Sequence, residues 1–287
     1  MAPLPTEVRA TAGGPVEFRF ERRGDDVLLI LHGGHMRAGL ALGEEPFAAA
    51  GFSVLAPSRP GYGRTPVRSG RTVAAYTDTV RALCADLDVA RVAAVVGISG
   101  GGPTAVALAA RHPDLVERLV LVSAVGPLPW PDRRTRIGGR IVFAPGVEAA
   151  TWAGIRMLLR ARGRRALGSL LSPLSTVRGP AELTDGDAEM LLRLFAAMRS
   201  GRGFVRDMRP APDLCAAVTQ PALVVASRTD GGVPFAHAEA LVAGLPRAEL
   251  VESRAAGHFV WCAPDWPAVA GRVAAFGRTP PDQVKAR

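Results

Sequence analysis

A serine set between glycines, in Gly97-Ile98-Ser99-Gly100-Gly101, is the part of this sequence best suited to do chemistry. An apolar, β-branched run precedes it, and an alanine-rich stretch with helical character follows at 104–111. A G-x-S-x-G sequence between a strand and a helix predicts a strained turn that exposes the serine as a nucleophile. Glycines at 97 and 101 have no Cβ, so they let the strand and the helix pass close together.

The residues around Ser99 also favour the development of negative charge beside it. Pro103 suits the first turn of a helix, where its missing N–H would have no partner in any case. The start of that helix would place free amides and the positive end of its dipole next to the serine. A membrane span between Arg91 and Arg111 is disfavoured by three consecutive glycines and a proline at its centre. Neither glycine pattern of a nucleotide-binding loop fits.

A serine hydroxyl needs a base that accepts its proton and a third group that orients the base. Asp230 and His258 each follow a predicted strand near the end of the chain. The chain order serine, aspartate, histidine is the one expected of one doubly wound hydrolase architecture. All three residues lie just beyond the carboxyl ends of strands, where open α/β sheets bind their ligands. We therefore expect Ser99, Asp230 and His258 to form one catalytic site.

A second glycine-containing loop, Leu31-His32-Gly33-Gly34-His35, directly follows a buried strand. Glycines at this place allow the backbone to approach a substrate, and an exposed amide there could help to bind an oxyanion. A simple tight turn would explain the same residues equally well. The sequence alone leaves both interpretations open.

Short apolar runs alternate with amphipathic segments, which predicts a mostly parallel sheet with helices on both faces. Runs that are apolar at every position fit strands buried on both faces. The predicted strands are 16–20, 27–31, 53–56, 92–98, 119–123, 222–226 and 248–251, and the predicted helices are 73–87, 104–111, 235–243 and 268–276. The expected fold class is α/β, doubly wound.

Residues 126–215 interrupt this alternation. They open with Gly-Pro-Leu-Pro-Trp-Pro, contain helical patterns at 151–162 and 188–199, and offer no obvious strand. We predict a helical cap inserted at 126–215 into an α/β core made of residues 1–125 and 216–287. A chain of 287 residues with 48% hydrophobic residues can form one large domain with such an insertion.

Taken together, these motifs resemble the α/β-hydrolase superfamily, in its serine-nucleophile, capped, esterase-like branch. The resemblance spans essentially the whole chain and rests on His32-Gly33-Gly34, Ser58-Arg59-Pro60-Gly61-Tyr62-Gly63, Gly97-Ile98-Ser99-Gly100-Gly101, Asp230 before Val233-Pro234, and Gly257-His258. It implies Ser99 as nucleophile, His258 as general base and then acid, and Asp230 as the orienting carboxylate. It also implies that the backbone N–H groups of Gly34 and Gly100 form the oxyanion hole, and that the cap sets substrate choice.

The function expected from this resemblance is hydrolysis of a small, largely apolar carboxylic ester or lactone through an acyl-enzyme intermediate. The same three residues would also serve C–C bond hydrolysis, cofactor-free perhydrolysis or an aminopeptidase, and these alternatives stay open. Relatives that are dehalogenases or epoxide hydrolases place aspartate where this chain has Ser99, and Gly100 replaces the tryptophan usual in proline iminopeptidases. A non-catalytic ligand-binding protein on the same scaffold is a further alternative, although a retired site has no physical need of all three residues.

Four further residues are candidates for substrate binding, namely His35, Trp130, Phe259 and Trp261. Ordinary packing would explain the three aromatic residues equally well. Among the other histidines, we expect His32 to be structural and both His112 and His237 to lie at the surface. The spacing of histidines and acids matches no metal site, so we expect neither a metal nor another cofactor.

The formal net charge of the chain is +9, and Lys285 is the only lysine among its basic residues. Residues 131–180 hold ten arginines and two acids. Such a patch could steer an anionic substrate or contact nucleic acid. Stacking aromatics and nucleic-acid motifs do not accompany it, so we expect a solvated face. The expected partner is a small-molecule substrate and not nucleic acid, and the oligomeric state is left open.

Targeting and redox signals are few. The first fifteen residues have no apolar core of the signal-peptide type, and no other segment qualifies as a membrane span. Three cysteines, Cys84, Cys215 and Cys262, lie far apart and match no zinc or redox spacing. Buried free thiols in a reducing compartment would fit this pattern, so a cytoplasmic location is expected.

Overall fold

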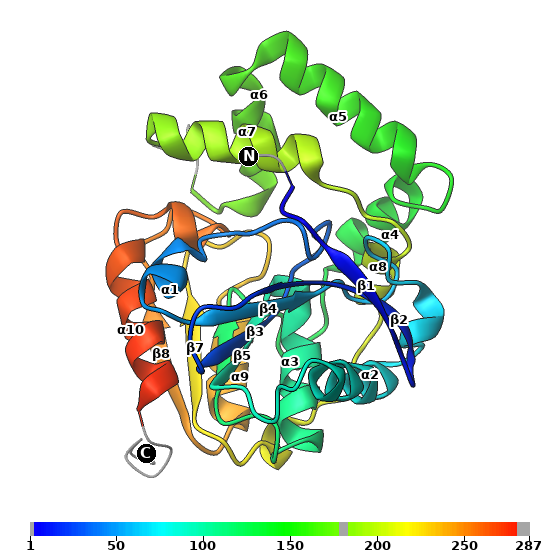
Figure 1. The fold of residues 1–287 in the computed structure, drawn as a ribbon. Coiled ribbons are helices and arrows are strands. Elements are labelled where there is room, and N and C mark those ends of the chain that lie inside the picture. The colour runs from blue at the N-terminus through cyan, green and yellow to red at the C-terminus, as the bar shows by residue number, and fades with distance from the viewer. Residues whose placement is uncertain (1–2, 178–182, 280–287) are drawn as a thin grey trace.

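The computed structural model describes residues 3–177 and 183–279, and its strands form an eight-stranded sheet (Figure 1). The strand order is β1-β2-β4-β3-β5-β6-β7-β8, with antiparallel pairing from β1 to β4 and parallel pairing from there on. The strands are β1 Glu7–Thr11, β2 Gly14–Glu21, β3 Val27–Leu31, β4 Ser53–Pro57, β5 Ala94–Ile98, β6 Leu119–Val122, β7 Ala222–Ala226 and β8 Ala248–Glu252. The predicted α/β fold class is confirmed.

The central strands alternate their side chains between two hydrophobic clusters, one on each face of the sheet. In β3, Leu28 and Ile30 belong to one cluster, whereas Leu29 and Leu31 belong to the other. The first cluster is completed by α1 (Glu45–Ala49) and α10 (Trp266–Arg278), and the second by α2 (Val73–Asp86), α3 (Gly102–Arg111) and α9 (Ala236–Gly244). Because burying one leucine side chain stabilises a fold by about 1.5–3 kcal/mol, this two-sided burial holds the sheet that carries the site.

All seven predicted strands are present, with small shifts at their ends. The strand predicted at 92–98 begins at Ala94, and Val92 forms only an isolated bridge with Val116. β1 was not predicted, because its first four residues are exposed and give no apolar pattern. It forms through backbone pairing with β2, in a register that places Glu7 opposite Phe18.

Within the described residues, five α-helices lie between β6 and β7, and we call them the inserted helices. They are α4 Arg133–Val142, α5 Glu148–Arg162, α6 Arg164–Leu171, α7 Asp185–Ala197 and α8 Gly203–Asp207. α5 and α7 match the predicted helical patterns, whereas α4, α6 and α8 were not predicted individually. No named strand occurs in the described parts of 126–215, and Figure 1 shows α5, α6 and α7 above the sheet. The domain boundaries stay a prediction.

No helix in residues 3–177 and 183–279 combines the length and apolar character needed to cross a membrane. The three cysteines are free thiols, with Cys84 and Cys215 buried and Cys262 partly buried. Burial raises the pKa of each thiol to about 12. A thiol with such a pKa stays protonated near neutral pH, and it is therefore a poor nucleophile. The cytoplasmic location stays a prediction.

Candidate active site

Ser99 occupies the sharp turn between β5 and α3. Its φ of +50° lies in the left-handed region, which a residue other than glycine adopts only where the surrounding structure enforces it. A Cβ on Gly97 would lie 2.6 Å from Ala105 Cβ, and one on Gly101 would lie 2.1 Å from the carbonyl oxygen of Leu31. Position 97 therefore needs glycine because β5 and α3 pass close together, and position 101 needs glycine because the turn lies against the end of β3.

The structure brings the three predicted catalytic side chains into one hydrogen-bonded row. His258 Nε2 lies 3.0 Å from Ser99 Oγ, and His258 Nδ1 lies 2.8 Å from Asp230 Oδ2. All three residues are buried. The carboxylate of Asp230 fixes Nδ1 as the protonated nitrogen, so Nε2 is free to accept the serine proton.

Backbone groups hold the carboxylate and the imidazole in place. The N–H groups of Gly232 and Val233 each donate to Asp230 Oδ1 at 2.8 Å, so one oxygen is fixed by the turn and the other faces His258. The N–H of His258 donates to the carbonyl oxygen of Leu174, which belongs to a short 3-10 turn directly after α6. The loop that carries His258 is therefore anchored on the insertion as well as on the core.

The two amides predicted for the oxyanion hole border Ser99. Gly100 follows it directly at the start of α3, and a Cβ on Gly33 would lie 3.1 Å from Ser99 Cβ, which brings the loop containing Gly34 beside the serine. Within the described part of the chain, the N–H groups of Gly34 and Gly100 donate to no acceptor. Free amides at the start of a helix and in a neighbouring loop are the donors that an oxyanion would require.

His32 has a structural place, as expected. Its Nε2 accepts a hydrogen bond from the backbone N–H of Arg59 at 2.9 Å, and its Nδ1 lies 2.8 Å from the carbonyl oxygen of Gly33. Burial, together with the charge of Arg59, lowers the pKa of His32 to about 3. The neutral imidazole thus links the end of β3 to the end of β4 below the proposed oxyanion loop.

A buried ion pair that the sequence did not reveal lies against Gly100. Arg59 donates two hydrogen bonds to the carboxylate of Asp207 in α8, at 2.7 and 2.6 Å, and Tyr62 Oη donates a third at 2.6 Å. Asp207 Oδ2 lies 3.2 Å from the position of a Cβ on Gly100. Burial lowers the pKa of Arg59, but the carboxylate of Asp207 outweighs it, so the pKa is raised overall. This cluster joins the inserted helices to the core beside Ser99.

His35 connects the proposed oxyanion loop to the inserted helices. Its Nδ1 lies 2.7 Å from Ser200 Oγ, which also accepts a hydrogen bond from Trp152 Nε1. The rings of His35 and Phe204 are 3.9 Å apart, and Phe204 covers Gly34. Burial lowers the pKa of His35 to about 3. Its predicted role in substrate binding stays a prediction, and its observed contacts are with the insertion.

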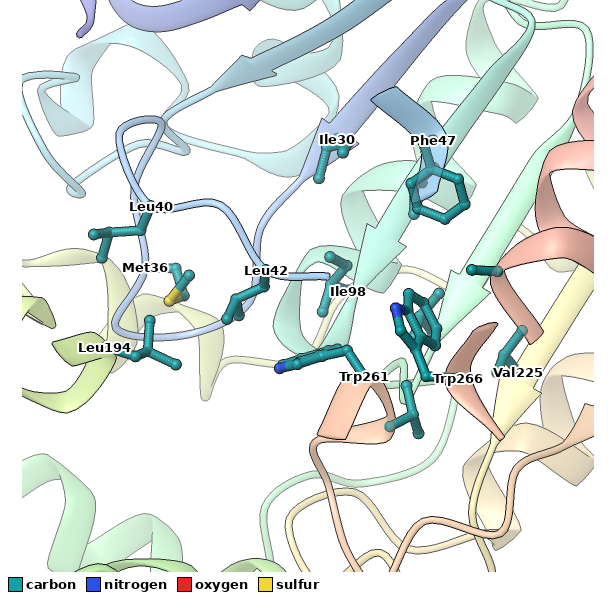
Figure 2. Close-up of a cluster of buried hydrophobic side chains, with 14 of the residues drawn as sticks. Ile30, Met36, Leu40, Leu42, Phe47, Ile98, Leu194, Val225, Trp261 and Trp266 are labelled. Atoms are coloured by element: carbon teal, nitrogen blue, oxygen red, sulfur yellow. The ribbon is translucent and has the colours of Figure 1, made fainter. Parts of the chain in front are cut away.

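The three aromatic candidates for substrate binding lie at different depths. Trp130 Nε1 donates to the carbonyl oxygen of Gly232, next to Asp230. The ring of Phe259 lies 5.9 Å from that of His258 and 5.3 Å from that of Trp261. Trp261 is buried in the same hydrophobic cluster as Ile98, the residue before Ser99 (Figure 2). Their roles in binding stay predictions.

The expectation that His237 lies at the surface is wrong. His237 is buried in α9, where its Nδ1 accepts a hydrogen bond from the backbone N–H of Gly126 at 3.0 Å. It thereby fixes the start of the stretch that leads into the inserted helices, and burial lowers its pKa. His112 is partly exposed, and its Nε2 pairs with Asp78 at 3.0 Å. Among the described residues, no three metal-ligating side chains gather at one place.

The sheet and this site together define a class of protein. A doubly wound sheet carries a serine after β5, an aspartate after β7 and a histidine after β8, and all three side chains meet at the carboxyl ends of the strands. This arrangement, with its strand–turn–helix around the serine, defines the α/β hydrolases.

Comparison with known proteins supports the same class, the α/β hydrolases. The family described as alpha/beta hydrolase fold matches residues 26–136, and that described as TAP-like protein matches residues 204–283. The uncharacterized hydrolase YcgS of Bacillus subtilis is 31% identical over 258 residues, which cover 87% of this chain and 90% of that protein. A pimeloyl-acyl-carrier-protein methyl ester esterase of Aromatoleum aromaticum is 32% identical over 248 residues, covering 80% and 90%.

A solved structure also supports the α/β-hydrolase fold. The structure of an alpha/beta hydrolase fold protein from Nakamurella multipartita superposes with a TM-score of 0.77 at 29% identity, covering 96% of this chain and 99% of that one. The chain belongs to the α/β-hydrolase superfamily and is an α/β-fold hydrolase, as its motifs indicated.

Proposed function

We propose that this hydrolase is a serine hydrolase that cleaves a small, largely apolar carboxylic ester or lactone through an acyl-enzyme intermediate. The observation that carries this proposal is the continuous row from Ser99 Oγ through the imidazole of His258 to the carboxylate of Asp230. A hydroxyl, an imidazole and a carboxylate in that order activate a nucleophile without a metal or another cofactor.

In the proposed reaction, Ser99 Oγ attacks the ester carbonyl while its proton passes to His258 Nε2. Asp230 stabilises the imidazolium through the hydrogen bond to Nδ1, and the N–H groups of Gly34 and Gly100 bind the negative oxygen of the tetrahedral intermediate. The imidazolium then gives its proton to the leaving alcohol, which leaves an acyl-serine. Water, deprotonated by the same histidine, hydrolyses the acyl-serine and restores the hydroxyl of Ser99.

The surroundings of the row support an apolar, uncharged substrate. Leu174 Cδ2 and the ring of His258 both lie within 3.2 Å of the position of a Cβ on Gly232, and Phe204 covers Gly34. The charge of Arg59 beside Gly100 is neutralised by Asp207, so this wall offers no free cation to an anionic acyl group. In this proposal, His35, Trp130, Phe259 and Trp261 form further parts of the binding wall.

A serine-directed organophosphorus probe tests the assignment. We expect the probe to label Ser99, as located by peptide mass spectrometry, and the label to be absent from a Ser99→Ala variant. Ser169→Ala, which changes an exposed serine in α6, is the matched control and should label like the parent protein. Labelling at another residue, or full esterase activity in Ser99→Ala, would show the proposal to be wrong.

The alternatives differ in the bond that is cleaved. A panel of p-nitrophenyl esters, lactones, vinylogous diketones and proline amides separates ester, C–C and peptide hydrolysis by kcat/KM, and a peracid assay detects perhydrolysis. We expect the highest kcat/KM on a short-chain ester or a lactone. Tight binding of a ligand with negligible turnover across the panel would instead favour the non-catalytic alternative.

A further inference from the structure

A large open cleft lies between the core and the inserted helices, and residues in and around α8 line part of it. Its volume is about 1250 Å³, and its lining comes from β1 and β2, the loop 61–71, the start of α5 and the residues around α8. Six arginines line it, namely Arg64, Arg68, Arg71, Arg202, Arg206 and Arg209. Ligand sites often form where two structural units meet, so the cleft has the position of a binding site.

The positive charge in this cleft is poorly compensated by the protein. Arg64 pairs with Glu17, but among the described residues no carboxylate pairs with Arg68, Arg71, Arg202 or Arg209. Glu148 is the one acid in the lining, and its carboxylate already binds Arg199 and the N–H of Ser200. Like charges gathered in a concave surface raise the local positive potential and attract anions.

Two of the six arginines are held in place by neutral or paired contacts. Arg206 donates through Nη2 to the carbonyl oxygen of Arg71 at 2.5 Å, so it spans the cleft from α8 to the loop of the core. Arg64 is fixed by Glu17 and by the carbonyl oxygen of Thr6. The remaining guanidinium groups are exposed around this fixed frame. Burial and the neighbouring Arg209 lower the pKa of Arg206, as expected where cations crowd one another.

We propose that this cleft is a binding site for a small compound with several phosphate charges. Guanidinium groups bind phosphate oxygens through paired, charge-assisted hydrogen bonds, and several of them from two sides of a cleft suit a chain of phosphates better than a single anion. No aromatic residue is present in the lining, so the cleft lacks the stacking surface on which proteins bind the bases of single-stranded nucleic acid. The recognised chemistry is therefore the phosphate groups themselves.

The cleft and the proposed active site share α8. Phe204 covers Gly34 and Asp207 lies against Gly100, whereas Arg202, Arg206 and Arg209 line the cleft. The same short segment therefore contributes residues both to the cleft and to the surroundings of Ser99. The site is distinct from the catalytic row, because none of its six arginines touches Ser99, His258 or Asp230.

Isothermal titration calorimetry with inorganic tripolyphosphate tests this site, with sulfate at matched ionic strength as the reference anion. We expect saturable binding of tripolyphosphate at one site per chain, at least about tenfold tighter than sulfate. Two double variants, Arg68→Gln/Arg71→Gln and Arg202→Gln/Arg209→Gln, each remove charge-assisted hydrogen bonds from one side of the cleft. Each should weaken the binding of tripolyphosphate about tenfold. Arg91→Gln/Arg254→Gln removes the same charge from two exposed side chains elsewhere and should leave Kd within about twofold.

The outcomes separate the possible explanations. Equal weakening in the control pair would mean that binding follows net charge alone, and it would overturn the proposal. Binding of tripolyphosphate no tighter than sulfate would overturn it as well. If a short single-stranded oligonucleotide binds, its binding is lost in the arginine variants, and tripolyphosphate does not bind, the cleft is a nucleic-acid surface and the proposal is wrong. Ser99→Ala should bind tripolyphosphate like the parent protein, so the result stands apart from the proposed hydrolase reaction.

Discussion

Removing the carboxylate of Asp207 tests how the inserted helices are held over the site. This carboxylate accepts two hydrogen bonds from Arg59 and one from Tyr62, with the side chains of Arg59 and Asp207 only 5% and 11% exposed. Asp207→Ala would leave the guanidinium buried without its counter-charge. Breaking a buried pair in this way typically costs about 3–5 kcal/mol, so we expect the free energy of unfolding to fall by that amount.

Two further variants divide this magnitude among its causes. Tyr62→Phe removes one charge-assisted hydrogen bond and keeps the ion pair, so a loss of about 1.5–3 kcal/mol is expected. The double variant Arg59→Met/Asp207→Leu removes both charges and fills the space with apolar side chains, which is often close to neutral for stability. Its unfolding free energy should therefore lie above that of Asp207→Ala, although it carries one more substitution.

Urea unfolding followed by tryptophan fluorescence and far-UV circular dichroism measures these differences, with kcat/KM on a short-chain ester measured in parallel. Because Asp207 contacts Gly100, we expect Asp207→Ala to lower kcat/KM as well as stability. A loss of stability below about 1 kcal/mol for Asp207→Ala would refute the reasoning, because an unpaired buried guanidinium costs more than that. So would a double variant that is less stable than the single one.

Three other predictions concern the row, the turn and a buried histidine. If the proposed function holds, Asp230→Asn should lower kcat about 10⁴-fold on the best ester, because it disturbs the tautomer of the His258 imidazole, while the far-UV spectrum stays unchanged. Gly101→Ala should lower the free energy of unfolding, measured in urea, by more than about 1–3 kcal/mol, because the new Cβ would lie 2.1 Å from a backbone oxygen. Gly154→Ala has open space around it in α5, so it should raise the free energy of unfolding by about 0.5–1 kcal/mol. Burial lowers the pKa of His32 to about 3, so its contribution to the free energy of unfolding should be complete above pH 6.5. As the pH falls from 6.5 towards 3, the unfolded chain takes up a proton that the folded chain does not, and the free energy of unfolding should fall by up to about 1.4 kcal/mol per pH unit. His32→Gln should flatten this slope when unfolding is measured across the pH range.

Much of the fold could be predicted from local residue patterns, because each pattern has a known physical cause. The run at 27–31 is apolar throughout and β-branched in part, which is typical of a short strand buried on both faces of a sheet. Likewise, the glycines around Ser99 are required by contacts of 2.1 and 2.6 Å, so the G-x-S-x-G sequence predicts the turn itself. Asp230 and His258 could be located because parallel strands bring their carboxyl ends to one edge of the sheet.

The features that the sequence did not reveal depend on contacts between distant segments. β1 buries almost nothing and exists through its pairing with β2. Asp207 lies in a five-residue helix that is too short to give a periodic pattern, and its partner Arg59 is 148 residues away along the chain. His237 is part of a helical pattern that says nothing about which face is covered, and only the fold places it against Gly126.

The position of the arginine cleft, which bears on function, also could not be predicted from the order of residues along the chain. Counting along the chain places the positive charge at 131–180, where the density of arginine is greatest. The fold instead lines a cleft with arginines from 64–71 and from 202–209, two short arginine-rich segments that lie far apart along the chain. They meet because Gly61 and Gly203 pack backbone against backbone, with a Cβ on Gly61 only 2.7 Å from the amide nitrogen of Gly203. One close contact between the core and α8 thus positions both Asp207 beside the serine and the arginines of the cleft.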